Sequence, residues 1–155
     1  MIAVLQRVKE ASVCVDGETV GACKHGLCIL LGVAKGDTEK DAEVLAEKIV
    51  NLRIFTDENG KMNLSLQDVN GEALVVSNFT LLAAYKKGKR PDYMSAAVPA
   101  EAERLYAYFA KLCAERLSHV GCGVFGADME VRIIGDGPVT IVMDSGVLLG
   151  TKSAN

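Results

Sequence analysis

The segment Ser77-Asn78-Phe79-Thr80-Leu81 carries two hydroxyl side chains directly after an apolar, strand-like run. The end of a buried strand is a common place for a binding site, and backbone N–H groups there can stabilise a tetrahedral oxyanion. The Thr80 hydroxyl could hydrogen-bond a reacting carbonyl, or act as a nucleophile if a base lay near it. The simpler alternative is that Ser77 and Thr80 only satisfy local backbone groups.

The segment Gly135-Asp136-Gly137-Pro138-Val139-Thr140 lies at the junction of two apolar runs. Proline fixes its own φ and lacks a backbone donor, whereas glycine lets a ligand approach the backbone closely. An X-Pro bond is also the kind of peptide bond that adopts the cis form at modest cost. Taken alone, a Gly-Pro pair between strands is usually a turn.

Four cations occur within the six residues Lys86-Lys87-Gly88-Lys89-Arg90-Pro91. The net charge of the chain is −3, so it does not coat nucleic acid by bulk charge, and any contact with a polyanion must be local. This cluster is a candidate for such a contact. A solvated loop is the alternative for a run of this kind.

Other familiar chemistry is missing from the sequence. There is no GxSxG nucleophile elbow, P-loop or GxGxxG motif, and the two His are isolated. The five Cys include no CxxC pair and are odd in number, which argues against a zinc site and a disulfide framework. We expect free thiols in a reducing cytosol, and neither a metal nor a cofactor.

The length of 155 residues fits one domain, which we place at residues 1–145, followed by a loosely ordered tail at 146–155. No apolar run is long enough to span a bilayer and no secretory signal is evident, so a cytoplasmic protein is expected. Apolar periodicity predicts helices over 38–51 and from Pro99. Strands are expected at 2–8, 11–16, 18–21, 27–33, 52–55, 73–82, 129–134 and 139–143, with the last two joined across Asp136-Gly137. The pattern favours an α+β fold with largely antiparallel strands and two main helices.

From Met1 to Ser145 the chain resembles the D-aminoacyl-tRNA deacylases. The resemblance rests on several motifs in the same order: Gln6-Arg7-Val8, Leu31-Gly32-Val33 with Gly36-Asp37-Thr38, 48–55, 60–65, 77–81, 88–91, 123–129 and 136–140. It implies a barrel-like sheet in an intertwined homodimer. It also implies hydrolysis of the ester that links a D-amino acid, or glycine, to the terminal adenosine of a tRNA.

The resemblance further implies a role for each matching residue. Gly137 and Pro138 would form a cis peptide that enters the partner's site, accepts the substrate α-ammonium group through carbonyl oxygens and excludes an L side chain. Arg7 would buttress this pair. The catalytic pocket would be lined by Ser77, Phe79 and Thr80, with Asn78, Phe125, Gly126, Ala127 and Met129 binding substrate, and Lys87, Lys89 and Arg90 contacting tRNA phosphates. Because no base for Thr80 is visible, we favour assistance by the substrate's ribose 2′-OH.

Two residues depart from the usual family pattern. Asn78 stands where Gln is usual, so its shorter amide is expected to alter the pocket or loop. Gly135 stands where Asn is usual, which should loosen the approach to Gly137-Pro138 and weaken stringency or stability. Two alternatives therefore stay open: a nucleic-acid-binding module without activity, and a Thr- or Cys-dependent hydrolase of small esters.

Overall fold

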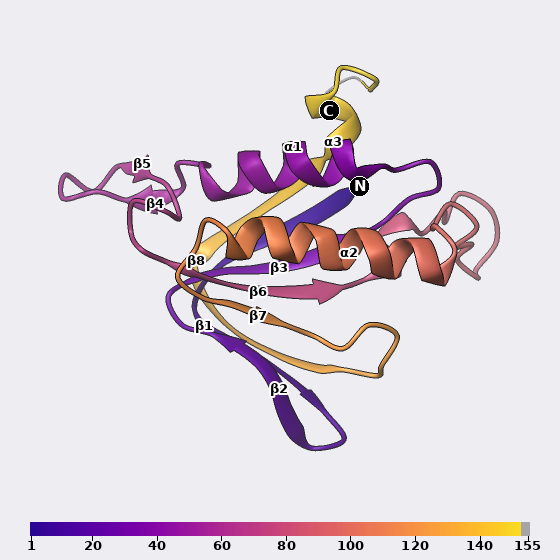
Figure 1. Ribbon diagram of the computed structural model, residues 1–155, viewed down its shortest axis with the longest axis horizontal. Helices are drawn as coiled ribbons and strands as arrows, with labels where there is room; N and C mark the ends of the chain where they lie inside the picture. Colours follow the sequence, from indigo (N-terminus) through magenta and orange to yellow (C-terminus); the bar gives the residue numbers. More distant parts are fainter. Residues whose placement is uncertain (153–155) are drawn as a thin grey trace.

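The computed structural model describes residues 1–152 as an α+β structure in which two long helices cover one face of a curved sheet (Figure 1). The elements in chain order are β1 (Ile2–Val15), β2 (Glu18–Cys23), β3 (Gly26–Gly32), α1 (Glu39–Val50), β4 (Phe55–Thr56), β5 (Met62–Leu64), β6 (Glu72–Ser77), the 3₁₀ helix η1 (Phe79–Leu82), α2 (Pro99–Ala114), β7 (Val120–Cys122), β8 (Glu130–Asp144) and α3 (Ser145–Leu148).

The long strand β1 organises the sheet, because it pairs antiparallel with β2, β3 and β8. β6 then adds parallel to β3, and β7 adds parallel to β6. The outer strands β2 and β7 approach each other so closely that a Cβ added at Gly21 or Gly121 would lie 2.3 Å from a facing backbone oxygen. The sheet is therefore nearly closed, and the predicted α+β fold with a barrel-like, largely antiparallel sheet is confirmed.

The two long helices bury their apolar faces as the periodicity predicted. α1 directs Leu45 and Ile49 into the core, and α2 directs Leu105 and Phe109 into it, with each of these side chains fully buried. Residues three and four positions apart share one face of a helix, so each pair forms a stripe toward the sheet. α2 also contacts β6, the strand that ends at Ser77.

The Gly-Pro segment is not a hairpin, and the prediction of two strands joined across Asp136-Gly137 is wrong. β8 is one strand, in which residues 136–139 lie between the pairs Val8–Gly135 and Gln6–Thr140 and face Arg7 alone. The Gly137-Pro138 peptide bond is cis. A bulge accommodates a proline without a ladder hydrogen bond, so the strand continues past it. The expected strands at 2–8 and 11–16 are likewise one strand, β1, whose pairing with β8 is irregular between Gln6 and Glu10.

Of the expected strand at 52–55, only Phe55 lies in a strand, the two-residue β4, which pairs with β5 at one end of the molecule. The expected strand at 73–82 ends at Ser77, because the chain then turns into η1. No helix among residues 1–152 is long and apolar enough to cross a membrane.

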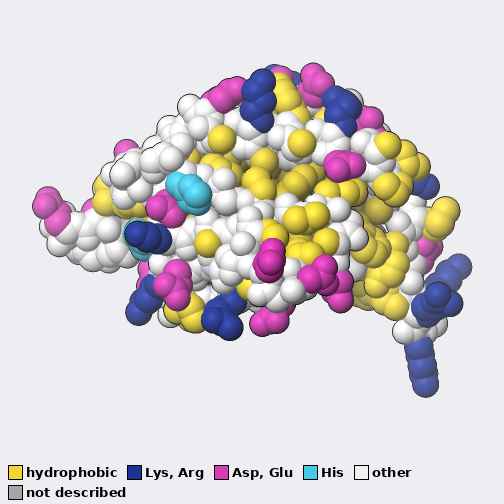
Figure 2. All heavy atoms as spheres, turned by 60° about the horizontal axis from the view of Figure 1, so that its bottom comes forward, with side chains coloured by type: hydrophobic (Ala, Val, Ile, Leu, Met, Phe, Trp, Pro, Cys, Tyr) yellow, Lys and Arg dark blue, Asp and Glu magenta, His cyan; other side chains and the backbone are white. Residues whose placement is uncertain are grey.

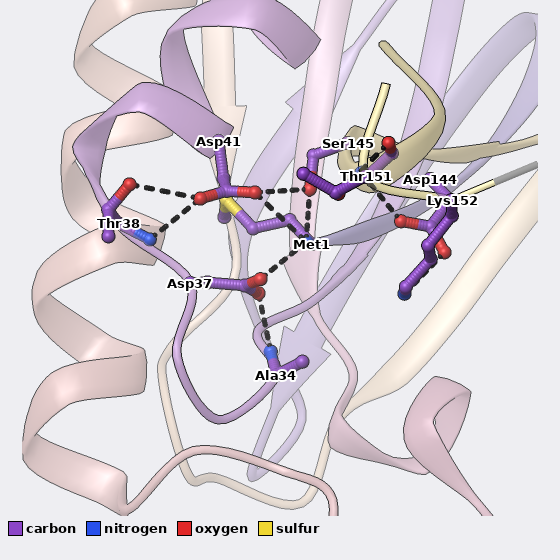
Figure 3. Close-up of polar contacts among 10 residues, drawn as sticks. Met1, Ala34, Asp37, Thr38, Asp41, Asp144, Ser145, Thr151 and Lys152 are labelled. Carbon is purple, nitrogen blue, oxygen red and sulfur yellow. Dashed lines mark hydrogen bonds and ion pairs between the residues drawn. The ribbon is translucent and has the colours of Figure 1, made fainter. Parts of the chain in front are cut away.

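The N-terminus meets Ser145, the residue that follows β8, beside α1 (Figure 3). The buried α-ammonium group of Met1 lies 2.8 Å from Asp37 Oδ1 and donates to Ser145 Oγ. Ser145 in turn donates to Asp41 Oδ1 at 2.6 Å. Within the segment 146–155, Lys152 Nζ lies 2.8 Å from Asp144 Oδ2, and residues 153–155 fall outside the described part of the chain.

Candidate functional site

A cavity of about 440 Å³ opens where β6 ends and η1 begins. Three segments that are distant in the sequence meet there: the end of β6 with η1, the entry to α2, and the loop between β7 and β8. The lining residues are Ser77, Asn78, Phe79, Ala96, Ala97, Pro99, Ala102, Phe125, Gly126, Ala127 and Met129. The fold thus brings together seven of the residues that the sequence proposed for the catalytic and substrate-binding groups.

Asn78 determines the local conformation at the cavity. Its backbone N–H donates to Leu31 O at 2.8 Å, which ties it to the end of β3. Its side-chain oxygen caps η1 by accepting the backbone N–H of Thr80 at 3.1 Å, and it also accepts the Thr80 hydroxyl. Asn is well suited to such a cap because its short side chain reaches back to the following turn. The shorter amide at this position therefore has a local partner.

Ser77 and Phe79 line the cavity, whereas Thr80 is exposed and does not line it. Its hydroxyl donates to an amide oxygen rather than to a base. The backbone N–H of Phe79, at the start of η1, has no hydrogen-bond partner within residues 1–152. This N–H is therefore a free donor beside the cavity, of the kind that can stabilise an oxyanion.

Tyr106 of α2 contacts the strands and the loop that form the cavity. Its hydroxyl donates to Val75 O at 2.8 Å and lies 3.3 Å from Gly123 O, so it joins the ends of β6 and β7. Its ring lies 6.0 Å from the ring of Phe125. Burial is the main cause that raises the pKa of the Tyr106 phenol, so the hydroxyl stays protonated and keeps its donor role.

The sequence did not identify Tyr106 or the four lining residues near the start of α2. Alanines at 96, 97 and 102 have no chemical group to attract attention, and they line the cavity by leaving space. Pro99 was recognised only as the first residue of a helix. A signal for Tyr106 existed in its place on the apolar face of α2, where a hydroxyl needs a partner.

Arg7 contacts Asp136, the residue that precedes Gly137 in the bulge. Arg7 Nε lies 3.1 Å from both the backbone oxygen and Oδ2 of Asp136, and Nη1 donates to Ile54 O at 2.6 Å. Gly137 and Pro138 are exposed and do not line the cavity of their own chain. Gly137 has a φ of +139°, a conformation that an L side chain rarely adopts.

The four cations at 86–90 occupy an exposed loop near the cavity. Backbone hydrogen bonds between Ala84 and Asp92, at 2.7 and 2.8 Å, close the base of this loop. Figure 2 shows Lys and Arg side chains projecting at the same end of the molecule, next to a broad hydrophobic area. Lys87, Lys89 and Arg90 are therefore accessible to a large ligand.

The thiols are poor candidates for nucleophiles. Burial raises the pKa of Cys28 and of Cys113 to about 12, and that of Cys23 to about 11, so these three stay protonated. All five Cys are free. Across residues 1–152 no three His, Cys, Asp or Glu side chains lie together as metal ligands would.

Comparison with known proteins decides the family. A family model described as D-Tyr-tRNA(Tyr) deacylase matches residues 4–144. The chain belongs to this family. The resemblance stated from the motifs is confirmed, and so, at the level of the family, is the expectation of a hydrolase that acts on aminoacyl-tRNA esters.

Relatives of this deacylase family match nearly the whole chain. A D-aminoacyl-tRNA deacylase of Caldicellulosiruptor saccharolyticus is 60% identical over 145 residues, which cover 94% of this chain and 97% of the relative. A solved structure named c-Myc DNA Unwinding Element Binding Protein is 43% identical with a TM-score of 0.87, covering 93% of this chain and 98% of that one. A structure described as a probable eukaryotic D-amino acid tRNA deacylase has a TM-score of 0.79 at 16% identity, covers 92% and 98% of the two chains, and shares the fold.

Proposed function

We propose that this protein hydrolyses the ester bond of D-aminoacyl-tRNA, and that of glycine wrongly attached to a tRNA, in the cytoplasm. The observation that carries the proposal is the cavity in which Ser77 and Phe79 face the loop 125–129. Its volume of about 440 Å³ lies within the range of small-molecule sites, and we assign it to the terminal adenosine with its aminoacyl group. Water attacks the ester carbonyl, the bond to the ribose 3′-oxygen breaks, and the free amino acid and tRNA leave.

The chemistry needs no side-chain nucleophile. The unpaired N–H of Phe79 stabilises the oxyanion, and the 2′-OH of the substrate ribose assists the attacking water. Two observations support this mechanism over a Thr80 nucleophile: the Thr80 hydroxyl donates to Asn78, and no base contacts it. The buried, protonated thiols of Cys23, Cys28 and Cys113 likewise speak against a Cys-dependent esterase.

Chiral selection arises from the Gly-Pro bulge of a second copy of the chain. The carbonyl oxygens of Gly137 and Pro138 accept hydrogen bonds from the substrate α-ammonium group, and the rigid backbone leaves no room for an L side chain. Glycine has no side chain to reject and is therefore a substrate. The proposal is supported by the exposure of the bulge, its absence from the lining of its own chain's cavity, and the exposed Val142 on β8, which is 69% accessible.

The activity is tested by measuring release of amino acid from D-Tyr-tRNA, Gly-tRNA and L-Tyr-tRNA. We expect rapid release from the first two and little from the third. Equal release of D- and L-tyrosine, or release of neither, would contradict the proposal.

The mechanism is tested with two changes. Replacing the terminal adenosine by its 2′-deoxy form should lower the rate strongly, whereas Thr80→Ala should keep a substantial rate. The reverse pattern would make Thr80 the nucleophile.

The shared site is tested by mixing two variants that each hydrolyse D-Tyr-tRNA poorly. Gly137→Ala damages the bulge and Phe79→Asp damages the cavity, so a mixed dimer holds one intact site. Co-expression should restore about a quarter of the wild-type activity, because half of the dimers are mixed and each has one working site. No restoration, together with a monomer in light scattering, would exclude a site shared between subunits.

A second candidate function is nucleic-acid binding without hydrolysis. It is favoured by the basic loop and by similarity to a protein named for binding a DNA unwinding element. Salt-dependent binding of RNA or DNA with no release of amino acid from any aminoacyl-tRNA would support it.

A further inference from the structure

Exposed aromatic side chains gather between the cavity and the basic loop. Of the twelve large hydrophobic side chains that are exposed among the described residues, five lie between positions 79 and 98. They include Phe79, 58% exposed, Tyr85, 83% exposed, and Tyr93, 38% exposed. A concentration of this kind on a surface marks an interaction site more often than scattered apolar residues do.

We call Phe79, Tyr93 and Tyr85 the aromatic row, because Phe79 lies at the cavity and the two tyrosines flank the base of the basic loop. Phe79 lines the cavity, and its ring meets the ring of Tyr93 edge to face, with centroids 5.1 Å apart. Ala84 and Asp92 form the antiparallel bridge at the base of the loop. Side chains alternate between the two faces of an extended pair, so the residues that follow the bridge, Tyr85 and Tyr93, share one face.

The row is bordered by unpaired positive charge. Lys86, Lys87, Lys89 and Arg90 lie in the tip of the loop, and none of them forms an ion pair with any of residues 1–152. The nearby acid, Asp92, uses Oδ1 to accept the N–H of Met94 at 2.7 Å, at the base of the loop. The tip therefore offers aromatic faces and cations together.

We propose that Tyr85 and Tyr93 stack the unpaired nucleotides that precede the ester-bearing adenosine, while the loop cations contact their phosphates. The inference rests on the proposed function and adds to it a recognition surface for the single-stranded 3′ end of the RNA. Unpaired bases stack on aromatic side chains regardless of sequence, and a positively charged groove follows the backbone. The aromatic row begins at the cavity, so an RNA 3′ end that follows the row brings its ester-bearing adenosine to the cavity.

The test measures kcat/KM of each variant on two substrates, full-length D-Tyr-tRNA and adenosine esterified with D-tyrosine. Tyr85→Ala should lower kcat/KM for the tRNA about tenfold, and should lower the ratio of the tRNA value to the adenosine value by the same factor. Tyr85→Phe keeps the ring and should keep the ratio. Met62→Ala is the matched control, because Met62 is 60% exposed on β5 at the opposite end of the molecule (Figure 1).

Binding of a fluorescent single-stranded RNA separates this inference from the proposed hydrolysis. Tyr85→Ala should weaken binding at every salt concentration without changing the dependence on salt, whereas Lys87→Ala should reduce the salt dependence and Lys61→Ala should change neither. These results would support the surface even if the wild type hydrolysed no ester.

Two results would overturn the inference. One is an unchanged ratio for Tyr85→Ala, whether kcat/KM falls equally on both substrates or on neither, and the other is equal binding of a blunt RNA duplex. Tyr85→Ala must melt at the wild-type temperature, as expected for a side chain that is 83% exposed.

Discussion

The Asn78 side chain connects a departure from the family pattern to the shape of the site. Its oxygen accepts the Thr80 N–H, so Asn78 caps η1, and the Phe79 N–H has no hydrogen-bond partner within residues 1–152. The residue that departs from the family pattern is thus part of the local structure around the candidate oxyanion donor.

Removing this cap should reduce both stability and activity. Asn78→Ala loses the acceptor for Thr80 N–H, and we expect a loss of about 1 kcal/mol in the free energy of unfolding, with a fall in kcat because η1 loosens. Asn78→Asp keeps an acceptor and should retain most of the stability. Urea unfolding and steady-state kinetics on D-Tyr-tRNA measure the two effects. Wild-type stability in Asn78→Ala would show that the cap contributes nothing.

Gly137 is the second residue whose replacement should change function. A Cβ at this position would lie 2.6 Å from Val139 N, and the φ of +139° is strained for any L residue. Gly137→Ala should therefore displace the bulge and lower the ratio of D-Tyr-tRNA to L-Tyr-tRNA hydrolysis. Gly135→Ala is the control, because nothing lies within 4 Å of its Cβ. If Gly137→Ala and Gly135→Ala had the same selectivity for D-Tyr-tRNA, the bulge would have no role in chiral selection.

At the scale of elements, hydrophobic periodicity predicts the helices and strands whose pattern lies within their own residues. The stripes on α1 and α2 and the apolar run of β3 gave these elements nearly their observed bounds. The bulge in β8 was not predicted because Gly-Pro has the same local signature in a turn. Only the pairing of β8 with β1, about 130 positions earlier in the chain, distinguishes the two. The alanines of the cavity wall were not predicted, because they line the cavity through their small size, and small size alone forms no sequence motif.

The contact between β3 and η1 offers a test at this scale. A Cβ at Gly32 would lie 2.4 Å from Leu82 Cδ2 and 3.0 Å from Asn78 O. Because Asn78 O is backbone, η1 itself must shift, so Gly32→Ala should cost about 1–3 kcal/mol of stability and lower kcat/KM. Chemical denaturation and kinetics would check this. Full activity would mean that η1 can move without damage to the site.

At the scale of the whole molecule, glycines on β2 and β7 allow the sheet to close. A Cβ at Gly121 would lie 2.3 Å from Ala22 O, so Gly121→Val should separate the two strands and cost at least about 1–3 kcal/mol. Hydrogen exchange should rise along β2 and β7 more than along β3. Val20→Ala, at a 42% exposed position of β2, should leave exchange unchanged. Uniform loss of protection would show that the seam is not a separate unit.

The contacts among the N-terminus, Ser145 and Asp41 make the stability of the whole molecule depend on pH. Burial of Asp41 acts to raise its pKa, but hydrogen bonds from Ser145 and Thr38 and the nearby α-ammonium group outweigh it, so the pKa lies below its usual 3.8. A carboxyl group whose pKa is lowered by folding stabilises the folded state above the unfolded pKa, and this contribution is lost as the pH falls through the folded pKa.

Asp41→Asn should therefore destabilise the protein most at neutral pH. We expect a loss of about 1–3 kcal/mol at pH 7, where the carboxylate accepts from Ser145 Oγ at 2.6 Å, and a smaller loss below the usual pKa of 3.8, where the wild type also loses this contribution. Urea unfolding from pH 7 down to about 2 measures the difference. Glu58→Gln, which removes an exposed acid far from this network, should show no such trend. A constant difference between Asp41→Asn and wild type across this range would mean that the carboxylate charge does not hold the N-terminus and Ser145 together.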